Sequence, residues 1–226
     1  VHLFLIVLIL GFLTGPRVIS AIQKLSGEEV SSPQSAQVVS SVTAEHPETE
    51  PAPLYTEDPY KGLETKAKSI YVWDINAHKK LYGVNEYTAL PLASLTKMMM
   101  AVVAKELIPE GGQVTIRPID LLEDGDTGLL VGEKWAFDEL LKFTLVASSN
   151  DGASALASVA GATLSRSTTT SAVESKKLFI AKMNEKAHDI GLTSTRFYNE
   201  SGLDLASLTS GAHGSARDMA MLFGSV

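Results

Sequence analysis

The feature that most constrains the fold is an apolar run from Leu95 to Val103, which contains three consecutive methionines. Its length and composition predict a helix that is apolar on all sides. Such a helix lies inside a core, because a surface helix needs one polar face. We therefore expect the chain to fold around this helix, with other elements covering it.

The first candidate catalytic pair lies at the start of this helix, at Ser94 and Lys97. Side chains three residues apart share one helix face, with Cβ atoms about 5–6 Å apart. The free backbone N–H groups of a first helical turn stabilise developing negative charge. Burial would lower the pKa of the Lys97 amine and make it a usable base. The alternative is chance, since Ser-x-x-Lys occurs about once in a chain of ordinary composition and this length.

The second candidate is the segment Ser148-Ser149-Asn150, between two predicted helices. The Ser148 hydroxyl could relay a proton to a leaving amine. The Asn150 amide could both donate to a substrate carbonyl and accept from Lys97. The alternative is a plain helix junction, because serine and asparagine are good helix caps.

Composition excludes several other kinds of chemistry. The formal net charge is -7 and no segment is strongly basic, so no nucleic-acid partner is expected. The sequence has no cysteine, which excludes thiolate catalysis and cysteine zinc sites. Its five histidines lack metal-ligand spacing, and no phosphate-binding glycine loop occurs. We expect no cofactor and no metal, so any covalent catalysis belongs to Ser, Thr or Lys.

The chain divides into three predicted regions. Residues 1–25 contain a short apolar run typical of a signal peptide or membrane anchor. The alternative is a buried helix of a soluble protein. Residues 26–67 are rich in Ser, Pro and Glu and predict a flexible linker. Residues 68–226 form the predicted domain, which we expect to be exported, periplasmic or extracytoplasmic, and possibly membrane-anchored.

The predicted domain starts with a β-hairpin and continues with helices. Asp138 is the expected cap of a helix that ends near Val146. Ser215 and Asp218 form an expected capping box for the last helix. The remaining expected elements are strands at Ser69–Asp74 and Lys80–Val84, helices at about Asp151–Val159 and Lys176–Ile190, and a Ser/Thr-rich loop at Ser165–Ser175.

Taken together, these motifs resemble the low-molecular-mass penicillin-binding D,D-carboxypeptidases, which carry Ser-x-x-Lys and Ser-x-Asn signatures. The resemblance covers about residues 69–223. The matching segments are Pro91 to Met98, Leu145 to Ala153, Met183 to Ala187, Gly191-Leu192, Thr195 to Asn199, Gly202 to Asp204 and Ser215 to Ala220.

The resemblance implies an α+β fold of the β-lactamase/transpeptidase type, with a helical cluster on a mainly antiparallel sheet. It implies that Ser94 is the acylated nucleophile, Lys97 its general base and Ser148 the proton relay. Asn150 would orient the substrate amide. The implied substrate is a peptidoglycan stem peptide that ends in D-Ala-D-Ala. The implied inhibitors are β-lactams, and the membrane is a partner if the first segment stays uncleaved.

One signature of the family is missing from these 226 residues, because no Lys-Thr/Ser-Gly triplet occurs. We therefore expect a C-terminally truncated domain that lacks its last strands and is inactive in this form. A non-catalytic peptidoglycan-binding or decayed penicillin-binding module is one alternative. A class A-like β-lactamase is another, although Glu174 does not start the Glu-x-x-x-Asn loop that its deacylation needs. A D,D-endopeptidase would use the same residues as a carboxypeptidase.

Overall fold

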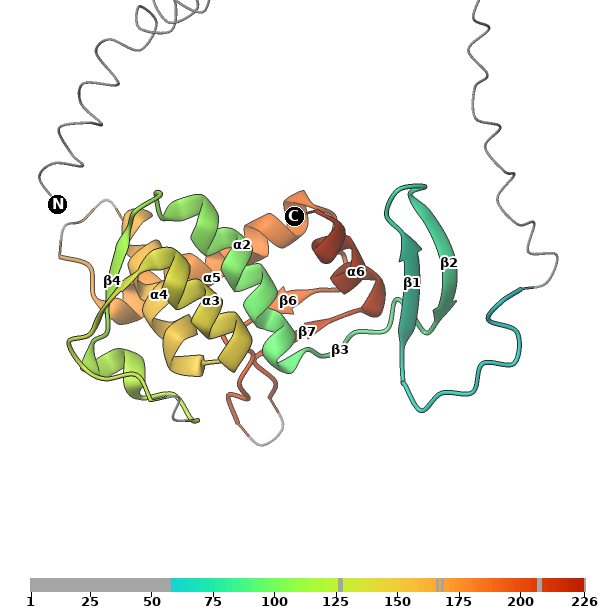
Figure 1. The fold of residues 1–226 in the computed structure, drawn as a ribbon, viewed down its shortest axis with the longest axis horizontal. Coiled ribbons are helices and arrows are strands. Elements are labelled where there is room, and N and C mark those ends of the chain that lie inside the picture. Colours follow the sequence, from blue (N-terminus) through green and yellow to red (C-terminus); the bar gives the residue numbers. More distant parts are fainter. Residues whose placement is uncertain (1–57, 126–127, 166, 168, 207–208, 226) are drawn as a thin grey trace, which may run out of the picture. The chain divides into compact units, whose positions relative to one another are not determined.

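A computed structural model describes residues 58–125, 128–165, 167, 169–206 and 209–225 (Figure 1). The predicted signal segment at 1–25 and most of the predicted linker at 26–67 lie outside the described residues. Residues 58–69 form turns and largely exposed coil that lead into the first strand. No helix within the described ranges is both long and apolar enough to cross a membrane.

The helices form most of the described fold. A 3₁₀ turn, η1 (Ala93–Leu95), leads into helix α2 (Thr96–Leu107), so the expected apolar helix is confirmed. Seven residues of α2 are buried, including Met99 and Met100 at 0 % exposure. The remaining helices are α3 (Phe137–Ala147), α4 (Asn150–Thr163), α5 (Ala172–Asp189) and α6 (Ala216–Gly224).

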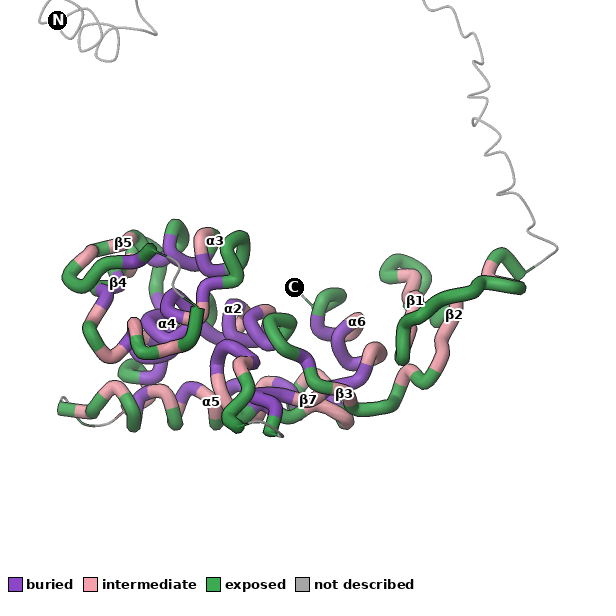
Figure 2. Tube along the Cα trace, turned by 90° about the horizontal axis from the view of Figure 1, so that it is seen from below, coloured by how far each residue is buried: buried purple, intermediate pink, exposed green. Residues whose placement is uncertain are grey.

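Helix α4 lies at the centre of the helical cluster, packed against α2, α3 and α5. Ten of its residues are buried, and most of them are Ala, Gly or Ser. These small side chains let the neighbouring helices approach closely. A Cβ atom on Gly161 would lie 1.9 Å from the carbonyl oxygen of Ser175 on α5. Figure 2 shows the buried trace gathered in this helical region.

Helix α5 covers α4 with one face of its surface. Its buried residues are Ser175, Phe179, Met183 and Ala187, which recur every four positions. Such spacing places all four on a single stripe of the helix, and the residues between them are partly or fully exposed. Phe179 and Met183 are fully buried, so α5 closes the core on this side.

The described strands form three small antiparallel sheets rather than one continuous sheet. The expected hairpin is present as β1 (Ile70–Asp74) and β2 (Lys79–Val84), with a bulge after Val72. A second pair joins β4 and β5, and a three-stranded sheet has the order β3-β7-β6. The bounds are β3 Leu90–Pro91, β4 Gln113–Thr115, β5 Lys134–Ala136, β6 Arg196–Phe197 and β7 Ala212–Gly214, with a 3₁₀ turn η2 at Pro118–Leu121. Helices with antiparallel strands confirm the α+β class.

The three-stranded sheet holds the start of the α2 segment in place. Strand β3 runs directly into η1, and Leu92 N donates to Ala212 O at 3.0 Å beside β7. Gly202 approaches the same turn so closely that a Cβ atom there would lie 1.9 Å from Ala93 O. Its φ of +80° or so is the left-handed conformation that glycine adopts without strain. Distant segments of the chain therefore fix the turn that carries Ser94.

Three expected details of the helix ends are wrong. Helix α3 begins at Phe137, one residue before Asp138, so Asp138 lies in the first turn and is not the cap. The expected Ser/Thr loop ends at Ser171, whose side chain caps α5 and makes it start earlier than predicted. Ser215 does cap α6, but Asp218 does not reach back to it.

The Asp218 carboxylate has a different task from the one expected. Its Oδ2 accepts from Ser194 N at 2.7 Å and from the Thr195 hydroxyl at 2.9 Å. Asp218 is fully buried, and buried carboxylates need such partners. It thereby joins α6 to the turn before β6, a long-range contact that a local capping motif does not predict.

Candidate active site

Three separate elements bring the four predicted site residues together. Ser94 comes from η1 and Lys97 from the first turn of α2. Ser148 ends α3, and Asn150 starts α4. Ser94 and Ser148 are exposed, whereas Lys97 is 2 % exposed. All four lie in one hydrogen-bonded group, so the predicted cluster exists as a structural unit.

The Lys97 amine sits among three oxygen atoms. Its Nζ lies 2.7 Å from Asn150 Oδ1, 3.1 Å from the Ser201 carbonyl oxygen and 3.2 Å from Ser94 Oγ. A neutral amine has two N–H donors and one lone pair. Asn150 and Ser201 oxygens can only accept, so they take the two donors. The lone pair is then left for the Ser94 hydroxyl, which is the geometry of a general base.

Burial sets the proton affinity of this base. It lowers the pKa of Lys97 below the usual lysine value, because the ammonium loses its hydration. The Glu200 carboxylate acts in the opposite direction and favours the ammonium. The lowering dominates, which supports the role expected for Lys97 from its position in the apolar helix.

Ser148 approaches the Ser94 hydroxyl from a different helix. Its Oγ donates to Ser94 Oγ at 2.8 Å. Ser148 is the C-cap of α3 and has the left-handed φ of 54°. This conformation turns the chain between α3 and α4, with Ser149 as the cap of α4. The segment is therefore a helix junction, as the alternative predicted, and it also brings Ser148 beside Ser94, so the catalytic role of Ser148 stays a prediction.

Asn150 is fixed at both ends of its amide. Its Oδ1 accepts from Lys97, and its Nδ2 donates to Asp124 O at 2.6 Å. The second contact fixes which way the amide points, since nitrogen donates and oxygen accepts. The orientation of Asn150 in turn directs one N–H bond of Lys97.

Two hollows meet at Ser94. One, of about 410 Å³, is mostly apolar and includes Leu95, Met98, Leu145 and Phe223 beside Ser94, Lys97 and Ser148. The other, of about 200 Å³, is lined by Ala93, Ser94, Asn150, Gly202, Leu203 and Asp204. The nucleophile candidate thus lies between an apolar hollow and one of mixed lining, and a chain-like ligand could cross it.

Sequence reasoning missed two residues of this site, Glu200 and Ser201. Both are buried, at 3 % and 2 % exposure. They fall between the family-like segments ending at Asn199 and starting at Gly202, so no motif marked them. The only sequence signal for Glu200 was an acidic residue just before the family-like segment that starts at Gly202. A backbone acceptor such as the Ser201 carbonyl has no sequence signal, because every residue has a carbonyl group.

Neither a metal site nor the β-lactamase acid is supported. No group of three or more His, Asp or Glu among the described residues could hold a metal ion. Glu174 lies in the first turn of α5, is exposed and pairs with Lys177 at 3.7 Å. It therefore does not reach the Ser94 cluster as a deacylating carboxylate would.

Comparisons with known proteins show the family of the chain. A family model described as D-alanyl-D-alanine carboxypeptidase, the Peptidase S11 family, matches residues 55–226. The chain belongs to this family, and its fold class is that of the penicillin-binding serine peptidases. It is 34 % identical over 147 residues to a D-alanyl-D-alanine endopeptidase of Haemophilus influenzae, covering 64 % of this chain and 46 % of that protein.

Other relatives extend the likeness. A D-alanyl-D-alanine carboxypeptidase of Bacillus subtilis is 30 % identical over 169 residues, with 71 % of this chain and 39 % of that protein covered. A crystal structure of D-alanyl-D-alanine carboxypeptidase from Mycobacterium tuberculosis matches with a TM-score of 0.59 and 27 % identity, covering 70 % of this chain and 55 % of that one. The chain spans about half the length of these relatives or less.

Proposed function

We propose that this protein is a serine-type D-Ala-D-Ala carboxypeptidase that trims peptidoglycan stem peptides. The observation that carries the proposal is the Ser94 hydroxyl, placed 3.2 Å from the Lys97 amine and 2.8 Å from the Ser148 hydroxyl. The buried amine can take the proton of the attacking serine, and the second hydroxyl can pass a proton to the leaving group.

The proposed reaction starts with attack of Ser94 Oγ on the carbonyl carbon of the penultimate D-alanine. The neutral Lys97 amine takes the Ser94 proton as the C–O bond forms. The proton then passes through the Ser148 hydroxyl to the nitrogen of the terminal D-alanine as the C–N bond breaks. Water hydrolyses the resulting ester and frees Ser94. The first-turn N–H of Ser94 is the proposed donor to the oxyanion.

The proposal extends to partners and location. β-Lactams would acylate Ser94, because they present a strained amide to the same nucleophile. An extracytoplasmic position, through the apolar segment at Leu3–Leu13, is part of the proposal, since the cell-wall substrate lies outside the cytoplasmic membrane. Its support is the composition of that segment.

Labelling with a fluorescent penicillin tests the proposal on the protein encoded by the intact gene. We expect covalent labelling of the native protein, loss of labelling in Ser94→Ala, and unchanged labelling in Ser167→Ala, an exposed serine outside the site. The labelled peptide should contain Ser94 by mass spectrometry. Equal labelling of Ser94→Ala would refute the nucleophile.

Endopeptidase activity is the second candidate, because the Haemophilus influenzae relative is named an endopeptidase. Both reactions use the same acyl-enzyme. Release of free D-alanine from a pentapeptide supports the carboxypeptidase. Cleavage of cross-linked stem-peptide dimers without D-alanine release supports the endopeptidase instead.

A further inference from the structure

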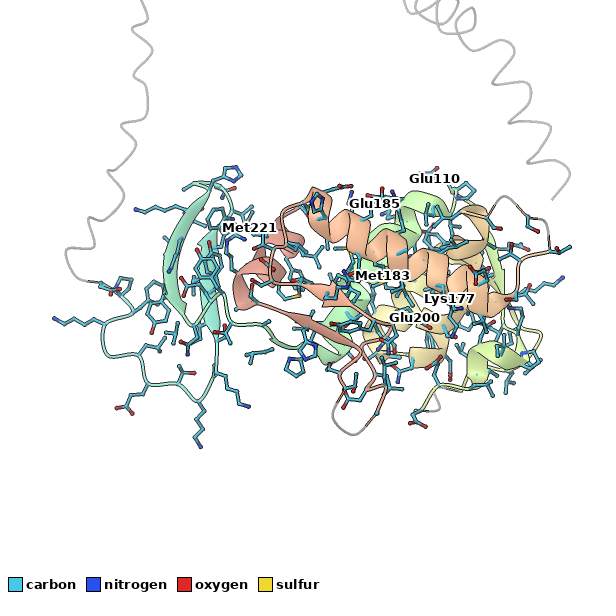
Figure 3. All side chains as sticks on the ribbon, turned by 180° about the vertical axis from the view of Figure 1, so that it is seen from behind. Glu110, Lys177, Met183, Glu185, Glu200 and Met221 are labelled. Carbon is cyan, nitrogen blue, oxygen red and sulfur yellow. The ribbon has the colours of Figure 1, made fainter. Side chains whose placement is uncertain are left out.

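A buried ion network lies behind the Ser94 cluster and is centred on Lys176 of α5. The Lys176 Nζ lies 3.0 Å from Glu123 Oε1, 3.1 Å from Glu200 Oε1 and 2.9 Å from Ser154 Oγ. These partners come from the segment after η2, the segment after β6 and helix α4. Figure 3 shows Glu200 beside α5, the helix that carries Lys176.

The network is withdrawn from water. The side chain of Glu200 is 4 % exposed, that of Lys176 17 % and that of Glu123 25 %. Burying a charge is costly unless an opposite charge and hydrogen bonds replace the lost water. The Glu200 carboxylate therefore depends on Lys176, which is its ion-pair partner.

Glu200 is also directly joined to the catalytic group. The next residue, Ser201, offers its carbonyl oxygen to the Lys97 amine at 3.1 Å. One short stretch of backbone thus points a carboxylate toward α5 and a carbonyl toward Lys97. The position of Glu200 therefore bears on an acceptor that orients the Lys97 lone pair.

The charges around Lys97 are mostly acidic. Glu200 faces it from the segment after β6, and exposed Asp204 lines the smaller hollow beside Ser94. Buried Asp151 lies on α4 next to Asn150, and Glu123 lies on the segment that holds the Asn150 amide. Of these carboxylates, Glu200 is the one that raises the pKa of Lys97 and favours its ammonium form. Lys176 is the positive charge within this set.

We propose that Lys176 is a positioning residue that holds and neutralises Glu200, so that Lys97 keeps its orientation and gives up its proton more readily. The inference rests on the proposed function for its catalytic consequence. Burial works to lower the pKa of Lys176, but Glu200 and Glu123 outweigh it and raise that pKa overall. Lys176 therefore stays charged while Lys97 titrates.

Three substitutions test this role through the pH dependence of acylation by penicillin. In Lys176→Met, the bare Glu200 charge should hold the proton on Lys97, and the midpoint of the acidic limb should rise by about one pH unit. Below the midpoint the rate then falls about tenfold, because one unit of pKa is tenfold in the fraction of free amine. Glu200→Gln should shift the midpoint in the opposite direction.

Lys176→Arg should keep the native midpoint, because it preserves the charge. The matched control is Lys177→Met, the next residue on α5, which is exposed and should change nothing. A Lys176→Met protein with a lower melting temperature but the native midpoint would overturn the proposal and leave Lys176 a structural residue only. A midpoint unmoved in Glu200→Gln would overturn it equally.

A direct titration separates this inference from the proposed function. The ¹³Cε NMR signal of Lys97, assigned by its loss in Lys97→Met, reports its pKa without any turnover. If the native protein fails to react with penicillin, the proposed function fails. The inference survives that result if Lys176→Met still raises the Lys97 titration midpoint, and it fails if the midpoint does not move.

Discussion

The helical cluster and the β1–β2 hairpin show how differently two regions of one chain are stabilised. Fully buried Met99, Leu156 and Phe179 belong to the cluster, whereas no residue of the hairpin strands is classed as buried. The segment after β2 is joined to α6 by Arg217, whose N donates to Glu86 O at 3.0 Å and whose guanidinium lies 5.9 Å from the Tyr87 ring centre. The candidate site therefore lies in the helical cluster, which is the closely packed region of the two.

The largest expected effect concerns the chemistry of the cluster. Lys97→Met should reduce the rate of acylation by penicillin about 10²–10⁴-fold, the usual contribution of a general base. In the native protein the rate should rise with pH through the lowered pKa of Lys97, because only the free amine accepts the Ser94 proton. Stopped-flow measurement of acylation from pH 5 to 10 gives the rate of the variant and the pH dependence of the native rate. A native rate independent of pH over that range would exclude Lys97 as the base.

The second effect concerns packing, measured with one aromatic residue from each region. Phe179→Ala should cost about 3–5 kcal/mol of unfolding free energy, because it empties a fully buried site in the core. Tyr82→Ala in β2 should cost only about 1 kcal/mol, mainly for the lost stack on Tyr60 at 4.9 Å between ring centres. Urea unfolding gives both values. An equal loss of unfolding free energy in the two variants would contradict the difference in packing between the two regions.

The third effect is smaller and compares two helix caps. Ser149→Ala should cost about 1–2 kcal/mol, because its fully buried Oγ accepts from Gly152 N at 2.8 Å. Ser171→Ala should cost about 0.5–1 kcal/mol, because water can replace its contact with Glu174 N at 3.2 Å. Thermal unfolding of both variants is the measurement. A larger loss of stability in Ser171→Ala than in Ser149→Ala would show that burial does not determine how much a helix cap contributes to stability here.

The smallest effect is expected at the ion pair of the hairpin. Lys80, whose side chain is 44 % exposed, pairs with the half-buried Glu86, and the water around Lys80 screens the attraction. Lys80→Ala should leave the melting temperature and penicillin acylation unchanged. Hydrogen exchange of the β1–β2 amides should become faster, which is the local measurement. Slower acylation in this variant would connect the hairpin to the site and contradict the comparison.

The sequence predicted those parts of the site whose signals are local. Ser94 and Lys97 share a helix turn, and Ser148 and Asn150 share a helix junction, so each pair forms a short motif, and the family resemblance joined the two motifs. The buried α2 helix was also readable, because its side chains are large and apolar. Helix α4 was predicted too short, since its Ala, Gly and Ser residues resemble a surface or a loop although ten of its residues are buried.

The rest depended on contacts between distant segments. Lys176 and Glu200 are 24 positions apart, and Asp218 meets Ser194 across another 24. No periodic pattern marks such pairs before the fold is known. The close approach of Gly202 to Ala93 could not be predicted from the sequence either, because a glycine in a loop usually indicates only a turn.

The left-handed backbone of Ser148 has a consequence for how this protein can evolve. Glycine adopts that conformation freely and is the usual residue at the end of a helix, whereas serine is strained there. If Ser148 has the proposed role, serine at this position trades some stability for activity. Ser148→Gly should then fold more stably and acylate more slowly, so natural selection for robustness alone would remove the hydroxyl of the proposed relay.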